Sequence, residues 1–410
     1  MRSFTKGLVL ILAFFFGLMP LFLIPGNLCA ADVSGRSEAR PGWDEGITYL
    51  LAMLKSRDMS FDVQKVSGLL DFAMSEKVGD AGLNPGQREN ATGAYFFVDI
   101  KAPLSKVIKY TYNTRIPAYL ILPSSIRLCG WQVKPTGPVS NLWKKVGKVN
   151  VPLMLRGVEY EEITPDLTTG AYYRYDSDRL MVLLKYRGKD FFISVTHQRN
   201  PSNVGRKGAI IGPDTDWNYF YSGRQGINKA GLGWVSSYMY DAFSVSILFE
   251  PGASKAKTRY ITFKWLRAGW NGINMVRREN ILEGCKRFAL GFRKVMESPQ
   301  LPPAEGLIDM YAKIKSLPDQ DLTARLQPID TALQRLCRTD PILSRKDFKD
   351  VIESGKYLDG MSREEKEGLL MSEYMKLAIG KPSYLDKSAF DYFPTFSLRV
   401  DHADKRTSNQ

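Results

Sequence analysis

The stretch from Lys257 to Met296 constrains the fold most, because its pattern is that of one strand, one tight corner and one long helix. From Arg259 to Trp265 the side chains alternate, with the apolar residues Ile261, Phe263 and Trp265 on one side. This two-residue period is typical of a half-buried strand. The segment Ala268–Asn274 follows, with two glycines and two asparagines, which favours a turn.

After the corner the apolar period changes to that of a helix. Apolar residues recur at steps of four and three, which places them on one helix face: Ile281, Cys285, Phe288, Phe292 and Val295. Pro299 is expected to end this helix. A strand and an amphipathic helix in succession both have apolar faces to bury, and laying the helix over the sheet buries both.

The chain has 410 residues and a formal net charge of +14, and almost all of that excess lies between residues 90 and 265. A basic region favours anionic partners such as lipid headgroups or acidic glycans. It also has the simpler role of keeping a protein soluble. The first 31 residues predict export, and an exported protein is not expected to bind nucleic acid.

The N-terminus has the features of a secretory signal. Arg2 and Lys6 precede an apolar run from Leu8 to Leu23, and Ala30 and Ala31 offer a cleavage site. The run is short for a membrane span and contains Pro20, so cleavage is favoured over anchoring. We therefore expect a periplasmic or secreted protein.

The remaining sequence predicts an α+β fold in which an antiparallel sheet is gripped by one long helix and followed by a helical C-terminal region. The expected parts are a signal peptide at 1–31, an N-terminal helical segment at 32–90, an α+β domain at 91–298, a helical region at 299–382 and a tail at 383–410. Strands are expected at Ala94–Ile100, Ile116–Leu122, Val151–Arg156, Val158–Ile163, Ala171–Tyr175, Leu180–Tyr186, Phe191–Thr196, Trp217–Tyr221 and Trp234–Phe249. Helices are expected at Trp43–Lys55, Phe61–Met74, Ala304–Ser316, Asp319–Cys337, Lys346–Ser354 and Arg363–Ile379.

Catalytic signals are scarce. The chain has two histidines, His197 and His402, and lacks the common hydrolase and metal-binding motifs. Two short acidic pairs, Asp176/Asp178 and Asp214/Asp216, are explained by turns. Glu159 and Glu161 share one strand face, which is most simply a solvated one, although glycosidases also use paired carboxylates. We predict no catalytic residue, metal or cofactor.

Two glycine-rich loops carry cations among flexible backbone, and such loops can bind an anionic group through their N–H groups. The candidate anion-binding residues are Arg206, Lys207 and Arg224. The mature chain keeps Cys129, Cys285 and Cys337. A bridge between Cys285 and Cys337 is possible after export, but buried free thiols are the favoured state.

The segments Ala94–Ile100 and Ala102–Val107 resemble the opening of START-type helix-grip domains, in which a first strand meets an A-P-x-x-x-V helix start. Residues 259–297 resemble the closing strand, corner and long helix of the same family. The resemblance spans about 91–298. It implies a curved antiparallel sheet and a helix that enclose a cavity for a lipid, sterol or other apolar molecule.

On this basis we expect a cavity between one face of the last two strands and the apolar face of the long helix. The candidate ligand-binding residues are Asp241, Phe243, Val245, Ile261, Phe263, Trp265, Arg267, Cys285, Phe288 and Phe292. Asp241 is expected opposite Arg267, where the pair would orient a polar end of the ligand. The alternative is a solid core in which the same apolar residues pack directly together.

Three functions fit the sequence. The first is a non-enzymatic carrier or sensor of an apolar or lipid-like molecule, with an anionic membrane surface as a possible partner. The second is an exported hydrolase that uses His197 or an acidic pair. The third is an envelope scaffold that binds an acidic partner through its basic face.

The signal sequence generates a direct prediction. N-terminal sequencing of the periplasmic or secreted protein should begin near Ala31 or Asp32, because the apolar run and the small residues after it suit a signal peptidase. Recovery of intact Met1 in a membrane pellet would contradict this prediction.

Overall fold

The computed structural model describes residues 42–56, 58–75, 83–135, 138–229, 233–252 and 256–390. The expected signal peptide at 1–31 and most of the expected tail at 383–410 lie outside these residues. None of the described helices combines the length and apolar composition that a membrane crossing requires.

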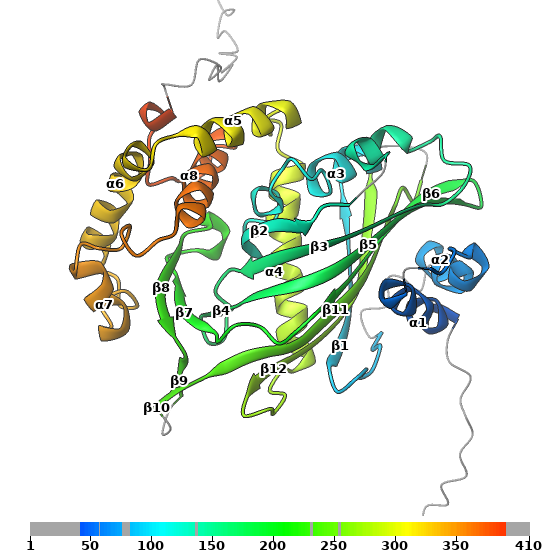
Figure 1. Cartoon of the computed structure of the whole chain (residues 1–410), viewed down its shortest axis with the longest axis horizontal. Helices are drawn as coiled ribbons and strands as arrows, with labels where there is room; N and C mark the ends of the chain where they lie inside the picture. The colour runs from blue at the N-terminus through cyan, green and yellow to red at the C-terminus, as the bar shows by residue number, and fades with distance from the viewer. Residues whose placement is uncertain are drawn as a thin grey trace, which may run out of the picture. The chain divides into compact units, whose positions relative to one another are not determined.

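A seven-stranded antiparallel sheet organises the fold, and its first strand lies beside its last (Figure 1). The strands, in spatial order, are β1 (Thr92–Ile100), β12 (Thr258–Trp270), β11 (Ser237–Phe249), β6 (Lys189–Gln198), β5 (Arg174–Tyr186), β3 (Leu153–Ile163) and β2 (Ile126–Val133). Every pair of neighbours is antiparallel. Since β1 is an edge strand and pairs with β12, the two ends of the segment 92–270 meet at one edge of the sheet.

Smaller elements extend this layer. A second sheet contains β4 (Ala171–Tyr172), β7 (Arg206–Ile210) and β8 (Tyr219–Gln225), and a two-stranded ribbon contains β9 (Ile227–Lys229) and β10 (Gly233–Val235). Short helical turns occur at η1 (Val63–Val66), η3 (Ala118–Leu120), η4 (Pro138–Lys145), η5 (Asp214–Asp216) and η6 (Lys387–Phe390).

One face of the large sheet is apolar and packs solidly beneath α1 (Gly42–Lys55) and α2 (Ser67–Met74). Trp43 of α1 stacks on Phe263 with ring centroids 5.1 Å apart, and Phe243 stacks on Trp265 at 5.2 Å. Phe263 and Trp265 are fully buried there. This face therefore forms a close-packed core of its own.

The opposite face changes character along its strands. Near the end of β11, Leu248 joins a large core with α3 (Leu104–Thr111) and the last turns of α4 (Arg278–Met296). Toward the start of the same strand and on the same face, positions 246 and 244 are serines. β6 shows the same change from Phe192 to Ser194. Apolar packing therefore gives way to a polar surface halfway across the sheet.

Four C-terminal helices share this second core. They are α5 (Ala304–Ser316), α6 (Asp319–Leu336), α7 (Lys346–Glu353) and α8 (Arg363–Ala378). Helix α8 contacts β2 and η3, and α7 contacts β8. Leu307 and Leu370 belong to the same apolar cluster as Leu183 and Phe292. The helices are therefore joined to the α+β part by a common core.

The helices agree closely with those expected from the sequence. α5 has the expected bounds, α8 begins at the expected Arg363, and the expected capping box is present, with the Ser362 hydroxyl accepting from the Glu365 N–H. Pro299 lies just after the C-cap of α4. These boundaries depend on local chemistry, which a sequence shows directly.

Several expected strands differ. The apolar run Ile116–Leu122 forms η3 instead, because Pro117 at its start lacks a donor for a ladder. The two strands expected at 151–163 form the single strand β3, and the expected turn at Asp176–Asp178 lies inside β5.

The shared core generates a prediction about the C-terminal helices. A chain that ends at Ser298 should lose cooperative thermal unfolding, because it exposes the apolar surface that α5–α8 cover. A control chain that ends at Phe390 keeps every described helix and should melt cooperatively. Circular dichroism melts compare the two, and a cooperative transition in the shorter chain would instead show that residues 32–298 fold without the C-terminal helices.

Candidate functional site

A cavity of about 520 Å³ lies between the polar half of the large sheet and α4. Its lining includes residues of β3, β5, β6, β11 and β12 from the sheet, together with Tyr112 after α3 and the loop at 164–169. Drug-sized ligands occupy pockets of about 300–1,000 Å³, so the space suits a small organic molecule.

The wall opposite the sheet belongs to α4 and is apolar at Ile281, Cys285, Phe288 and Phe292. Cys285 is buried, while Phe288 is half-buried and borders the cavity. The Phe288 ring lies 5.2 Å from the Tyr260 ring and 5.3 Å from the Phe292 ring, measured between centroids. The helix places these residues at the cavity because they recur every three or four positions.

The sheet side of the cavity is polar because small hydroxyl side chains occupy alternate positions on neighbouring strands. Thr196 of β6 and Ser244 of β11 are hydrogen-bonded at 2.8 Å. Ser246 bonds to the Tyr260 hydroxyl at 2.9 Å and donates to Thr262 at 3.2 Å. These hydroxyls form hydrogen bonds with one another and make a polar floor. Because their side chains are short, the space between this floor and α4 stays open.

A cluster of charged groups lies at one side of this floor. The guanidinium of Arg179 donates from Nε to Glu159 Oε1 at 2.6 Å and from one terminal nitrogen to Ser194 Oγ at 2.6 Å. Its other terminal nitrogen contacts Glu159 and lies 3.5 Å from Glu161 Oε1. The Tyr175 hydroxyl donates to Glu161 Oε2 at 2.8 Å. Arg179 is therefore the one cation of this cluster and pairs with two carboxylates, Glu159 and Glu161.

Burial decides the protonation of this cluster. Burial raises the pKa of Glu159, Arg179 lowers it, and the neighbouring Glu161 raises it again, leaving the pKa of Glu159 at about 7. Burial also raises the pKa of the Tyr175 hydroxyl, and Glu161 raises it further, so Tyr175 remains a neutral donor. A carboxyl group with a pKa near 7 inside a cavity is a feature of functional sites.

The cavity opens beside exposed apolar side chains. Leu167 and Met275 both line it and are 49% and 45% exposed. Trp270, at the end of β12, also lines it. An apolar rim of this kind favours entry of a molecule with an apolar part.

The structure divides the expected ligand-binding residues between the two faces of the sheet. Cys285, Phe288 and Phe292 of α4 line the cavity. Phe243 is among the residues around the cavity, but its side chain belongs to the core under α1 and α2. Val245, Ile261, Phe263 and Trp265 lie on the other face, in the core under α1 and α2. Their expected orientation toward α4 is therefore reversed. The reason is that two N-terminal helices cover the more apolar face, leaving the hydroxyl-rich face to α4.

Asp241 and Arg267 are paired across β11 and β12, which is the register expected from the sequence. Their side chains have other partners: His197 Nε2 lies 3.0 Å from Asp241 Oδ1, and Arg267 donates to the Gly272 carbonyl at 3.1 Å. Neither residue lines the cavity. A β-bulge between Met239 and Asp241 shifts the alternation there, so Met239 lines the cavity although Asp241 does not.

His197 also lies away from the cavity, with its ring 5.2 Å from the Phe243 ring. Glu89, His197 and Asp241 each bring one potential ligand atom within 4.8 Å of the others. Glu89 is exposed and lies 3.7 Å from the Lys55 ammonium. This group can hold a metal ion, but the Asp241 contact already accounts for the position of the imidazole.

The candidate anion-binding residues lie on the small sheet, and two of the three have protein partners. Lys207 of β7 donates to the Thr169 carbonyl at 2.6 Å, and Arg224 of β8 lies 3.3 Å from Asp350 of α7. Arg206 is half-buried on β7. The three cysteines of the described chain are free thiols, including Cys285 and Cys337.

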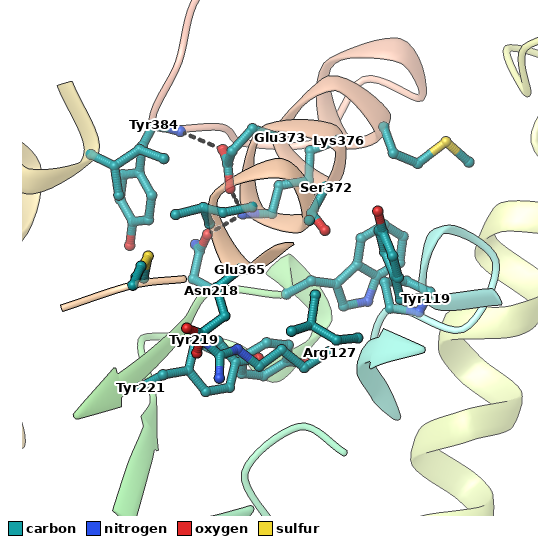
Figure 2. A pocket seen from close by; sticks show the side chains of 18 of the residues that line it. Tyr119, Arg127, Asn218, Tyr219, Tyr221, Glu365, Ser372, Glu373, Lys376 and Tyr384 are labelled. Atoms are coloured by element: carbon teal, nitrogen blue, oxygen red, sulfur yellow. Dashed lines mark hydrogen bonds and ion pairs between the residues drawn. The ribbon is translucent and has the colours of Figure 1, made fainter. Parts of the chain in front are cut away.

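A second, smaller pocket of about 70 Å³ lies beside α8 (Figure 2). Lys376 donates to Glu373 at 2.5 Å and to Asn218 at 2.7 Å, and Arg127 lies 2.8 Å from Glu365. Burial opposes the charge of Arg127, but Glu162 and Glu365 outweigh it and raise the pKa of Arg127. These paired groups attach α8 to β2 and to Asn218, just before β8, which is a structural role.

The sequence reasoning missed Arg179 and most of the polar floor. It recognised that Glu159 and Glu161 share a face but favoured solvent for that face. The available signal was the run of hydroxyl residues at alternate positions in strands that otherwise bury apolar groups: Ser194 and Thr196, Ser244 and Ser246, and Thr262.

In comparisons with known proteins, the chain matches no protein-family model and no curated protein. The case for a function therefore depends on the cavity and its charges.

The pKa of Glu159 generates a prediction about stability. Because this pKa lies above the ordinary value of 4.5, the folded chain keeps a proton that the unfolded chain releases, so Glu159 makes stability fall as pH rises from about 4.5 to about 7. Glu159→Gln removes this loss. The unfolding free energy of Glu159→Gln minus that of wild type should therefore be about 1–3 kcal/mol larger at about pH 8 than at about pH 5, since one pKa unit corresponds to about 1.4 kcal/mol.

Urea unfolding at the two pH values measures this difference. Glu283→Gln is the control, because Glu283 also lines the cavity but is exposed. If the unfolding free energies of Glu159→Gln and wild type depend equally on pH, Glu159 is ionised at both pH values.

Proposed function

We propose that this protein binds an apolar or lipid-like small molecule in the cavity between the large sheet and α4, as a carrier or sensor. The cavity itself is the observation that carries the proposal: it combines a volume of about 520 Å³ with an apolar helix wall, a polar floor and an apolar rim. This distribution suits a molecule with an apolar body and one polar end.

The order of the strands supports the same proposal. The first strand lies beside the last, and a long helix follows the last strand and contacts β1. This arrangement supports the resemblance to START-type domains. In that family the space between sheet and helix holds an apolar ligand. We propose that α4 has the same gripping role here, with the helices α5–α8 as an addition.

The proposal includes the compartment. The expected signal peptide would place the mature protein in the periplasm or outside the cell, where an apolar molecule needs a carrier to cross water. The basic charge of residues 90–265 would favour an anionic membrane surface as the source or destination of that molecule.

A hydrolase is the second candidate, and the buried pair Glu159 and Glu161 favours it. One carboxyl group with a pKa of about 7 beside a second carboxylate is the arrangement of a general acid and its partner. The hydrolase requires turnover of a bound molecule, whereas the carrier requires only its reversible binding. Recovery of the bound molecule unchanged after incubation favours the carrier.

Two phenylalanines that lie on opposite sides of the sheet, Phe263 of β12 and Phe288 of α4, provide the test of the cavity. Phe263→Ala in the solid core should lower the unfolding free energy by about 3–5 kcal/mol, through lost burial and a new cavity. Phe288→Ala should lower it by less, because the Phe288 ring already borders empty space. Thermal and urea unfolding of the two variants gives this comparison.

Phe288→Trp should fold normally and reduce uptake of a neutral fluorescent dye such as Nile red, because the larger ring extends into the cavity. In a packed core the same change would cost about 1–3 kcal/mol. Large stability losses in both Phe288 variants, with no dye bound by the wild type, would refute the cavity as a binding site.

A further inference from the structure

We infer that the cavity selects molecules whose polar end is a cation, such as a protonated amine, over molecules that end in a carboxylate. This inference rests on the proposed function and names the class of ligand that the same site would take. It follows from the balance of charge on the cavity floor and from the bonds that Arg179 already makes.

The charged cluster on the floor holds one cation, Arg179, for two carboxylates, Glu159 and Glu161. All three nitrogens of the Arg179 guanidinium contact protein groups: Nε and one terminal nitrogen contact Glu159, and the other terminal nitrogen donates to Ser194. A ligand carboxylate would therefore have to displace Glu159 from Arg179. It would also bring a third negative charge into a buried site, which is costly.

The other charged groups around the cavity either have protein partners or, like Lys264 beside Ser244 on the sheet, are exposed. Arg287 of α4 is held by Asp214 through three contacts of 2.7–3.0 Å. Asp166 accepts hydrogen bonds from the backbone of Thr168, Thr169 and Ala171. Lys264 and Glu283 are both exposed, with opposite charges.

The remaining titratable groups of the lining stay neutral. Burial raises the pKa of the hydroxyls of Tyr112, Tyr173, Tyr175 and Tyr260. Burial likewise raises the pKa of the thiols of Cys129 and Cys285. The uncompensated charge of the floor therefore comes from Glu159 and Glu161.

In the empty cavity a proton on Glu159 balances this charge, consistent with its pKa of about 7. A cationic ligand would replace that proton: the ligand ammonium binds the carboxylate, and the proton of Glu159 passes to solvent. The apolar part of the ligand would lie against Phe288 and Phe292 of α4. Binding of the cation should therefore strengthen as pH rises through about 7.

Three eight-carbon probes test the inference in wild-type protein: octylamine, octanol and octanoate, each competing with bound Nile red. Octylamine stays protonated and octanoate stays ionised between about pH 6 and about pH 8, so a change in preference reports on the protein. At about pH 8 octylamine should displace the dye at a concentration about tenfold lower than octanoate, which corresponds to a modest charge interaction. At about pH 6 the difference between the displacing concentrations of octylamine and octanoate should be smaller.

Glu159→Gln should remove most of this preference and its pH dependence, because the neutral amide cannot release a proton. Glu353→Gln, which changes an exposed carboxylate of α7 outside the cavity lining, should keep both. Equal displacement by the three probes, or stronger displacement by octanoate, would overturn the cation preference while leaving the cavity as a binding site. Failure of wild-type protein to bind Nile red would overturn the proposed function and the cation preference together.

Discussion

A single antiparallel sheet with two chemically different faces determines how the described chain is built. The face beneath α1 and α2 carries large apolar side chains such as Phe263 and Trp265, which pack without a gap. The face toward α4 carries serine, threonine, glutamate and arginine in its central part. Polar side chains of this kind need hydrogen-bond partners, which the apolar rings of α4 do not offer.

The space between these two surfaces follows from that mismatch. At the end of the sheet where Leu248 and Phe192 replace the hydroxyl residues, α3 and α4 close over the strands and the core is solid again. The cavity is therefore confined to the part of the sheet where α4 meets polar groups. A bound molecule with an apolar body and a polar end would satisfy both surfaces at once.

The charged cluster on the cavity floor also requires that its buried charges be balanced. A buried ion pair rarely repays the cost of removing its charges from water, and removing one partner is more costly still. Here Arg179 has two carboxylate partners, so one negative charge is left over and the proton on Glu159 offsets it. A site whose charge is balanced by a removable proton is suited to exchanging that proton for another cation.

Much of the fold could be predicted from the sequence, because its signals are local. Prolines and caps define α5 and α8, and the alternation in β11 and β12 gives the pairing of Asp241 with Arg267. The sequence could not show which face of the sheet each helix covers, since α1, α2 and α4 all have apolar sides. Ile261 and Phe263 were consequently expected at the cavity. The contact of Arg179 with Glu159 depends on strand register across 20 residues of sequence, which local patterns do not contain.

The proposal that the cavity holds a small amphipathic molecule is tested most directly by native mass spectrometry of the protein purified from its own cells without denaturation. The account predicts a species heavier than the polypeptide by the mass of one small molecule, and release of that molecule when the protein is unfolded. A mass equal to that of the polypeptide alone, in preparations that also fail to take up amphipathic molecules, would contradict it.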